Sequence, residues 1–164
     1  MTPPLPRVMG GKTMQTRFSL DLDLTTEEQL RLLQVWQYLV ELESGDAVVP
    51  RELADYLAGA NAKGDLPERR FKELIGTDDP GLEFIHADKA SLRIYDIDGS
   101  PNLRTLCKII AHVIPRVIPL EFSFALIDEA NHRYSGGIVV ITADSAEIQT
   151  IDSLLARRGK QRLH

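Results

Sequence analysis

An alternating pattern of apolar and polar positions marks the first regular element of the chain. Over residues 17–24 the apolar positions are Phe18, Leu20, Leu22 and Leu24, and every other position is polar or charged. Successive side chains of a β-strand point to opposite faces, so this period of two predicts a strand with one buried face. Asp21 and Asp23 then lie on the exposed face of that strand.

A repeat near 3.6 residues follows and predicts a helix over residues 26–43. Thr25 and Glu28 have the spacing of a capping box, which sets the start of this helix. Similar patterns, several with a proline at or near the expected start, predict further helices. These are expected from Pro50 over the segment PRELADYLA, and over residues 67–75, 102–114 and 146–158.

Two pairs of strand-like runs predict hairpins. Residues 82–85 and 92–97 flank a polar turn at residues 86–90, and residues 120–127 and 137–142 are joined by a polar connection of hairpin length. Because the strands are joined by hairpins as often as by helices, we expect an α+β fold. Its sheet is expected to be antiparallel-biased and accompanied by about five helices.

Length and composition are typical of one globular domain, since 43% of the 164 residues are hydrophobic and 26% are charged. We expect a flexible arm at residues 1–14, which hold three prolines and two glycines, and one compact domain over residues 15–164. The single cysteine, Cys107, excludes a disulfide within the chain and fits a reducing compartment, so we expect a cytoplasmic protein. No window approaches the ~20 apolar residues of a membrane helix, so no membrane partner is expected.

The net charge of −5 is distributed unevenly along the chain. Residues 45–98 hold 7 basic and 12 acidic side chains, a net of −5, whereas residues 1–44 carry −2 and residues 99–164 carry +2. Nonspecific affinity for nucleic acid comes mainly from Lys and Arg side chains that neutralise phosphates. The acidic middle segment therefore favours protein partners over DNA.

The segment Asp21-Leu22-Asp23-Leu24-Thr25 resembles the DxDxT signature of haloacid dehalogenase-type phosphotransferases. The resemblance implies a Mg²⁺-dependent phosphatase in which Asp21 attacks phosphorus and Asp23 moves a proton. An acidic metal pair would stand at residues 78–79, and Thr142 would be the phosphate-binding hydroxyl. In that family, however, the Ser/Thr motif precedes the acidic pair and the central strand is apolar on both faces. The opposite order and the alternation here favour a solvated strand face followed by a capping threonine.

Cys107 and His112 are the other candidates for chemistry. They stand five residues apart on an expected helix, which places them on different faces and makes them a poor metal pair. The apolar neighbours of Cys107 favour a buried, unreactive thiol. We therefore expect no catalytic residue, no metal site and no cofactor.

Residues 49–97 run helix, turn, helix and hairpin, and with the preceding helix this order resembles a winged helix-turn-helix within residues 25–98. In that family the second helix of the motif reads the major groove and the wing touches the neighbouring backbone. The resemblance implies a recognition helix at residues 67–74. The DNA contacts that it implies are Arg69, Arg70 and Lys72 on this helix, with Lys89 and Arg93 in the wing.

Residues 119–158 are similar to the closing segment of small uncharacterised proteins of phages and plasmids. The likeness is carried by Phe122, Phe124, Gly136, Gly137, Val140, Thr142 and Leu154. It implies a mobile-element setting and no particular activity.

The leading hypothesis from the sequence is a non-catalytic protein-binding regulator or inhibitor, encoded by a mobile element and directed at a host complex. Its outward carboxylates would occupy a cationic groove meant for phosphates, as anti-CRISPR proteins do. The carboxylates expected on this acidic surface are Asp21, Asp23, Asp78, Asp79, Asp96 and Asp98. A winged-helix DNA-binding transcriptional regulator is the alternative, and the Mg²⁺-dependent phosphatase is a third reading.

Overall fold

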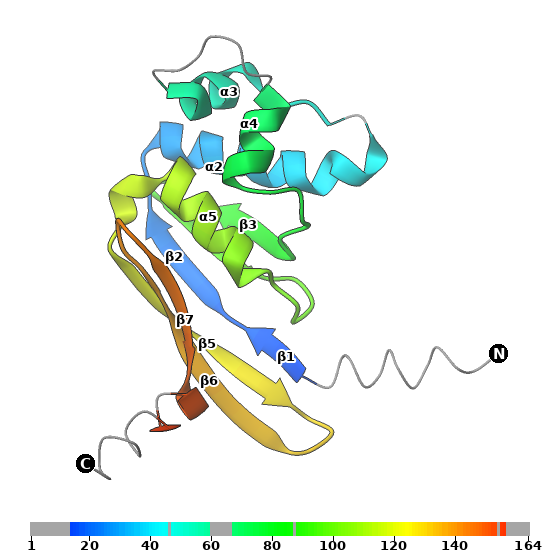
Figure 1. Cartoon of the computed structure of the whole chain (residues 1–164), viewed down its shortest axis with the longest axis vertical. Helices are drawn as coiled ribbons and strands as arrows, with labels where there is room; N and C mark the ends of the chain where they lie inside the picture. Colours follow the sequence, from blue (N-terminus) through cyan, green and yellow to red (C-terminus); the bar gives the residue numbers. More distant parts are fainter. Residues whose placement is uncertain (1–13, 46, 60–66, 87, 154, 157–164) are drawn as a thin grey trace, which may run out of the picture.

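Two antiparallel sheets divide the strands of the chain in the computed structural model, which describes residues 14–45, 47–59, 67–86, 88–153 and 155–156 (Figure 1). The four-stranded sheet has the order β1 (Met14–Arg17), β5 (Leu120–Asp128), β6 (Arg133–Ile141), β7 (Ala146–Thr150). The three-stranded sheet has the order β2 (Ser19–Asp23), β4 (Ser91–Asp96), β3 (Leu82–His86). Helices and antiparallel sheets together confirm the α+β class. Apart from Met14, the arm expected at residues 1–14 lies outside the described residues.

The first predicted strand is split between the two sheets. β1 pairs with β5, whereas β2, which begins only two residues after β1 ends, pairs with β4. Phe18 lies at the junction, is buried, and keeps the apolar alternation continuous through it. An uninterrupted alternation carries no sign of a change of sheet, so the sequence predicted one strand where the structure has two.

The helices follow the predicted order closely. They are α2 (Thr26–Glu41), α3 (Arg51–Ala58), α4 (Pro67–Leu74) and α5 (Leu103–Val113). The capping box at the start of α2 is confirmed, because the Glu28 backbone N–H donates to Thr25 Oγ1 and the Thr25 backbone N–H donates to the Glu28 carboxylate. Both predicted hairpins, β3–β4 and β5–β6, are also confirmed. No helix in the described part of the chain is long and apolar enough to cross a membrane.

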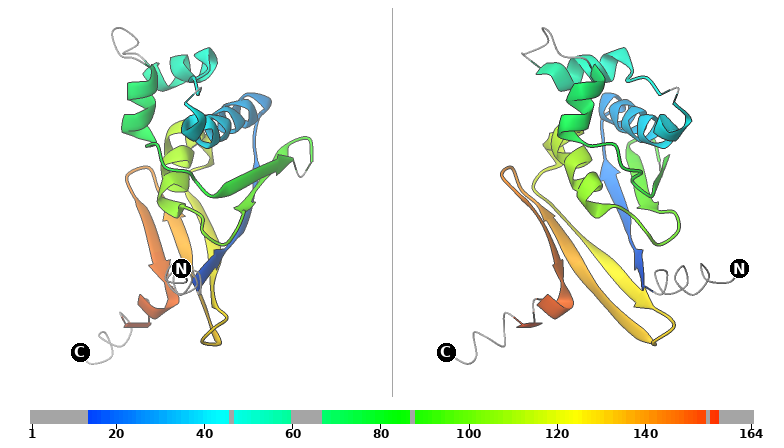
Figure 2. Two further views of the ribbon diagram at one scale, coloured as in Figure 1. Left: turned by 90° about the vertical axis from the view of Figure 1, so that its right-hand side faces the viewer. Right: turned by 45° about the vertical axis from the view of Figure 1, so that its right-hand side comes forward.

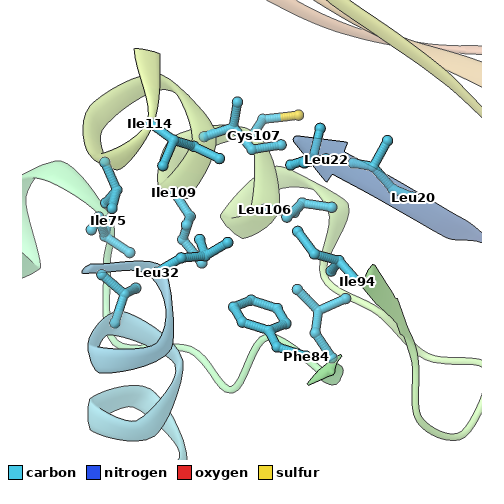
Figure 3. Packing of buried hydrophobic residues seen from close by; sticks show 14 of the residues in the cluster. Leu20, Leu22, Leu32, Ile75, Phe84, Ile94, Leu106, Cys107, Ile109 and Ile114 are labelled. Atoms are coloured by element: carbon cyan, nitrogen blue, oxygen red, sulfur yellow. The ribbon is translucent and has the colours of Figure 1, made fainter. Parts of the chain in front are cut away.

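A single cluster of buried side chains joins the helices to both sheets. Figure 3 shows Leu22 and Ile94 of the three-stranded sheet facing Leu106 of α5, with Leu32 of α2 nearby. Phe122 of the four-stranded sheet belongs to the same cluster. Removing this apolar surface from water is the main force holding the layers together. One face of α5 is therefore fixed against the core, which leaves its other face to build a site.

The helix predicted over residues 146–158 is wrong for its first five positions. Residues Ala146–Thr150 form β7, whose Ile148 lies opposite Val139 of β6. The strand contains Ala, Glu and Gln, which favour helix locally, but pairing with the apolar strand β6 overrides that weak preference. Helical conformation begins only at Ile151. The chain therefore reverses direction after β6 and returns along it.

Candidate functional site

A cleft of about 570 Å³ opens between α5 and the turn that joins β6 to β7. In both views of Figure 2 this turn lies beside α5. Three basic side chains of α5, Arg104, Lys108 and His112, line one wall. Because an α-helix has 3.6 residues per turn, their spacing of four places them on one face, along a rise of about 12 Å. The cleft therefore has a basic wall on the side of α5 that faces away from the core.

The opposite wall is the turn at residues 142–145, which supplies two hydroxyls and one carboxylate. The Thr142 backbone N–H donates to the Ser145 carbonyl over 2.8 Å, and the Ser145 backbone N–H donates to Thr142 Oγ1 over 3.1 Å. The two hydroxyl oxygens lie 3.1 Å apart. These bonds hold the turn closed and keep Thr142 and Ser145 exposed at the cleft, with Asp144 between them.

Apolar side chains line the remainder of the cleft. Ile141 of β6 is fully buried, and Ile148 of β7 keeps 39% of its surface exposed. Cys107 and Ala111 contribute from α5. Burial raises the pKa of the Cys107 thiol to about 11. At neutral pH this thiol is protonated and behaves as a small apolar group.

The charges of the cleft are not neutralised within the described residues. Arg104 and Lys108 take part in none of the ion pairs that these residues form, and neither does Asp144, the only carboxylate in the lining that the structure describes. Although its ring keeps contact with solvent, His112 has a lowered pKa, because partial burial and the positive charges of Arg70 and Lys108 disfavour its protonated form. The cleft is therefore net positive at neutral pH, with Arg104 and Lys108 as its permanent cations.

Asp96, one of the six carboxylates expected on an acidic surface, is instead part of the interior. Its side chain is 5% exposed, and it accepts hydrogen bonds from Arg17 Nη1 at 2.9 Å and from two backbone N–H groups, those of Phe18 and Gly99. Asp96 thereby ties the junction between the two sheets to the end of β4. A carboxylate used in this way is not available to a partner.

Asp21 and Asp23 do lie on the exposed face of the three-stranded sheet. Asp21 is bound by Arg93 through two hydrogen bonds of 2.7 and 3.1 Å. The hydrogen bond from Arg93 lowers the pKa of Asp21. Asp23 accepts a hydrogen bond of 2.7 Å from the Ser91 hydroxyl. Of this pair, Asp23 keeps the less compensated charge.

The remaining three carboxylates lie in loops at the other end of the same sheet. Asp79 accepts from the Gly81 backbone N–H and Asp98 from the Ser100 backbone N–H, both as local turn contacts. The two loops touch, since the Ile97 backbone N–H donates to the Gly81 carbonyl. Asp78 is exposed beside Asp79. The six carboxylates thus form three separate groups: a buried one, a pair on the sheet face and a loop cluster.

The five basic residues expected to contact DNA are also dispersed. Arg69 and Lys72 are exposed on α4, but Arg70 donates to the Leu57 carbonyl and pairs with Glu73. Arg93 is engaged with Asp21, and Lys89 lies in the β3–β4 turn. In the left view of Figure 2, α4 and this turn lie on opposite sides of α2. The structure has the expected helix–helix–hairpin order but does not bring these cations onto one face.

The residues that the phosphatase hypothesis assigns to catalysis are not brought together either. Asp21 lies on the outer face of the three-stranded sheet, whereas α5 covers the inner face of that sheet and Thr142 lies in the cleft beyond α5. Thr25 is engaged in capping α2. Within the described ranges, no group of three or more His, Cys, Asp or Glu side chains is placed to hold a metal ion.

Comparison of the chain with protein-family models, with curated proteins and with solved structures finds no match in any of the three. The candidate site therefore rests on geometry. The basic wall was not predicted, although its signal is present in the sequence, because Arg104, Lys108 and His112 repeat every four residues on an expected helix. The other wall was missed, because it depends on β7, which the sequence pattern assigned to a helix.

Proposed function

We propose that the protein is a non-catalytic binding protein whose cleft between α5 and the β6–β7 turn takes a small anionic ligand. The observation that carries the proposal is the row formed by Arg104 and Lys108, whose charges have no carboxylate partner among the described residues. An anion bound there would supply the missing counter-charge.

The surroundings of Arg104 and Lys108 strengthen the attraction of these two cations for an anion. Hydrogen bonds from charged donors are roughly twice as strong as those between neutral groups. A partly enclosed site also lowers the effective dielectric constant below that of water, so that each charge acts more strongly. The Ser145 hydroxyl on the facing wall can turn toward an anion as a neutral donor, whereas the Thr142 hydroxyl already donates to the Ser145 carbonyl.

The nearby reactive side chains support binding rather than covalent catalysis. Cys107 keeps its proton until about pH 11, and the thiolate, not the thiol, is the nucleophile. A general base also needs a group that orients it, and within the described residues His112 has no hydrogen-bonded carboxylate partner. The cleft has cations without an ion-pair partner and room for a ligand, but the described residues that line it include no activated nucleophile.

Calorimetric titration with inorganic tripolyphosphate at low ionic strength tests this proposal. Wild type should bind, and Lys108→Gln should weaken binding by about tenfold, which corresponds to about 1.4 kcal/mol. Lys72→Gln is the matched control, because Lys72 is an exposed lysine on α4 outside the cleft. Absence of saturable binding, or an equal loss in the two variants, would contradict the proposal.

A second candidate function is the protein-binding regulator or inhibitor, acting in the cytoplasm on a host complex. It is favoured by the exposed sheet face, where Asp21 and Asp23 project from β2 without a covering layer among the described residues. Affinity capture from the host, after nuclease treatment, should then recover a basic protein that Asp23→Lys no longer retains and Asp78→Lys still does. Loss of the captured partner on nuclease treatment would instead favour the winged-helix regulator, with DNA contact through Arg69 and Lys72.

A further inference from the structure

The cleft is larger than a bare anion needs. Its volume of about 570 Å³ lies within the range of roughly 300–1,000 Å³ that is usual for pockets holding organic ligands. The two permanent cations occupy only the α5 wall. A small inorganic anion held by Arg104 and Lys108 would therefore leave the apolar floor and the facing wall exposed to water.

The apolar floor continues the buried face of the four-stranded sheet. Phe122 of β5, Val139 of β6 and Ile148 of β7 lie opposite one another in register. Phe122 and Val139 are buried, but Ile148 is on the edge strand and keeps 39% of its surface exposed at the cleft. An uncharged ligand body seated on Ile148 would complete this face and remove the exposed apolar surface from water.

The charges of the cleft are asymmetric, and this orients a ligand. Cations stand on the α5 wall, while Asp144 stands on the turn. Asp144 repels anionic groups and accepts hydrogen bonds from hydroxyl or amino groups. The anionic end of a ligand is thus directed to α5, and an uncharged end with hydrogen-bond donors is directed to the turn.

The spacing of the cations selects among anions. Arg104 and Lys108 are separated by one helical turn, a rise of about 6 Å, so a chain of linked anionic groups matches them better than one compact group. The planar guanidinium of arginine binds phosphate oxygens in pairs, and lysine acts on phosphate as a point charge. A phosphate group also carries more charge than a carboxylate, about −1.5 to −2 at neutral pH.

We infer that the cleft binds an organic phosphate, with its phosphate chain along Arg104 and Lys108 and its uncharged, donor-bearing ring over Ile148 and toward Asp144. This inference rests on the proposed function and names the chemical class of the ligand. Nucleoside triphosphates combine a phosphate chain with an uncharged ribose and base that carry hydroxyl and amino donors. They are therefore the probes of choice.

The test compares probes that share a phosphate chain but differ in the uncharged group attached to it. Calorimetric titrations with ATP, GTP and CTP are set against inorganic tripolyphosphate, with citrate as the carboxylate probe. At least one nucleotide should bind about fivefold or more tightly than tripolyphosphate, and citrate should bind more weakly than that nucleotide. Ile148→Ser should reduce the ratio of the nucleotide affinity to the tripolyphosphate affinity to less than about twofold. Ile97→Ser, the same substitution at an exposed position outside the cleft, should alter neither affinity.

The outcomes separate this inference from the proposed function. If tripolyphosphate binds as tightly as every nucleotide, the cleft takes bare anions, the inference is overturned and the proposed function stands. If citrate binds more tightly than the nucleotides, the phosphate class is overturned in the same way. If no probe binds, both fail. Thermal unfolding of Ile148→Ser, expected to show a cooperative transition above the temperature of the titration, guards against loss of the fold as the cause of an effect.

Discussion

Two charged regions of this molecule differ in where their counter-charge comes from. In the interior, Asp96 is met by Arg17 at 2.9 Å, and Glu28 accepts a hydrogen bond of 2.6 Å from Arg116. Both carboxylates are almost fully buried. In the cleft, Arg104 and Lys108 lie exposed and meet no carboxylate in the part of the chain that the structure describes.

The majority charge of a chain is therefore not always the charge that remains available to a partner. The net charge of −5 drew attention to the carboxylates. Several of them serve the fold instead, because a buried carboxylate must be paired or hydrogen-bonded to offset its loss of water. Arg104 and Lys108 of α5 form no ion pair among the described residues, so their charges remain available to a ligand.

The largest expected effect comes from removing the buried carboxylate of Asp96. Asp96→Ala should lower the free energy of unfolding by about 3 kcal/mol, because it removes the acceptor of the Phe18 and Gly99 backbone N–H groups and of Arg17 Nη1. Urea denaturation measures the loss. Asp98→Ala, at an exposed neighbour, should change the same quantity by less than about 0.5 kcal/mol. Equal losses in the two variants would contradict the structural role of Asp96.

Glu28→Gln should cost about 2 kcal/mol of unfolding free energy at neutral pH, because it weakens both the helix cap and the contact with Arg116. Burial raises the pKa of Glu28, but the hydrogen bonds from Arg116 and Thr25 outweigh it, and the net pKa is below the ordinary 4.5. A lowered folded-state pKa means that this stability is complete above about pH 4.5 and is lost as pH falls through the folded value. Urea denaturation near neutrality and in acid should therefore show wild type and variant converging in acid. A constant difference between them would be evidence against the ionised pair.

The cleft cations should behave in the opposite way to these carboxylates. The double variant Arg104→Gln/Lys108→Gln should keep the free energy of unfolding within about 0.5 kcal/mol of wild type, or raise it, because no described ion pair is lost and a repulsion is removed. Thermal unfolding checks this. A loss as large as that of Asp96→Ala would show that Arg104 and Lys108 stabilise the fold. It would contradict their assignment to a ligand site.

His112 should produce the smallest effect. Its lowered pKa keeps it neutral at pH 7, so acidification adds a third positive charge to the cleft only below its ordinary value of 6.5. Sulfate, which does not titrate in this range, should bind about two- to threefold more tightly near pH 5.5 than near pH 7.5. His112→Gln should flatten that dependence in the same titration. An unchanged pH profile in the variant would show that another group titrates.

Local patterns predicted much of the fold. The capping box of α2 and the two hairpins depend on neighbours in the sequence, and they are confirmed. The change of sheet at Phe18 depends on pairing with distant strands, and the sequence contained no signal for it. The strand β7 pairs locally with β6 through the turn at residues 142–145, but its Ala, Glu and Gln residues favoured a helix in the sequence. For the site, the repeat of basic residues on α5 is present in the sequence, but no site was predicted there. The burial of Asp96 and the position of the 142–145 turn opposite α5 left no local signal, because both result from contacts between segments far apart in the chain.

Nuclear magnetic resonance of the ¹⁵N-labelled protein, titrated with tripolyphosphate, locates the anion on the molecule. We expect saturable shifts of the backbone amide signals of Arg104, Lys108 and residues 142–145, with the signals of α4 unmoved. Saturable shifts confined to Arg69 and Lys72 on α4, or no saturable shift anywhere, would contradict the assignment of the anion site to the cleft.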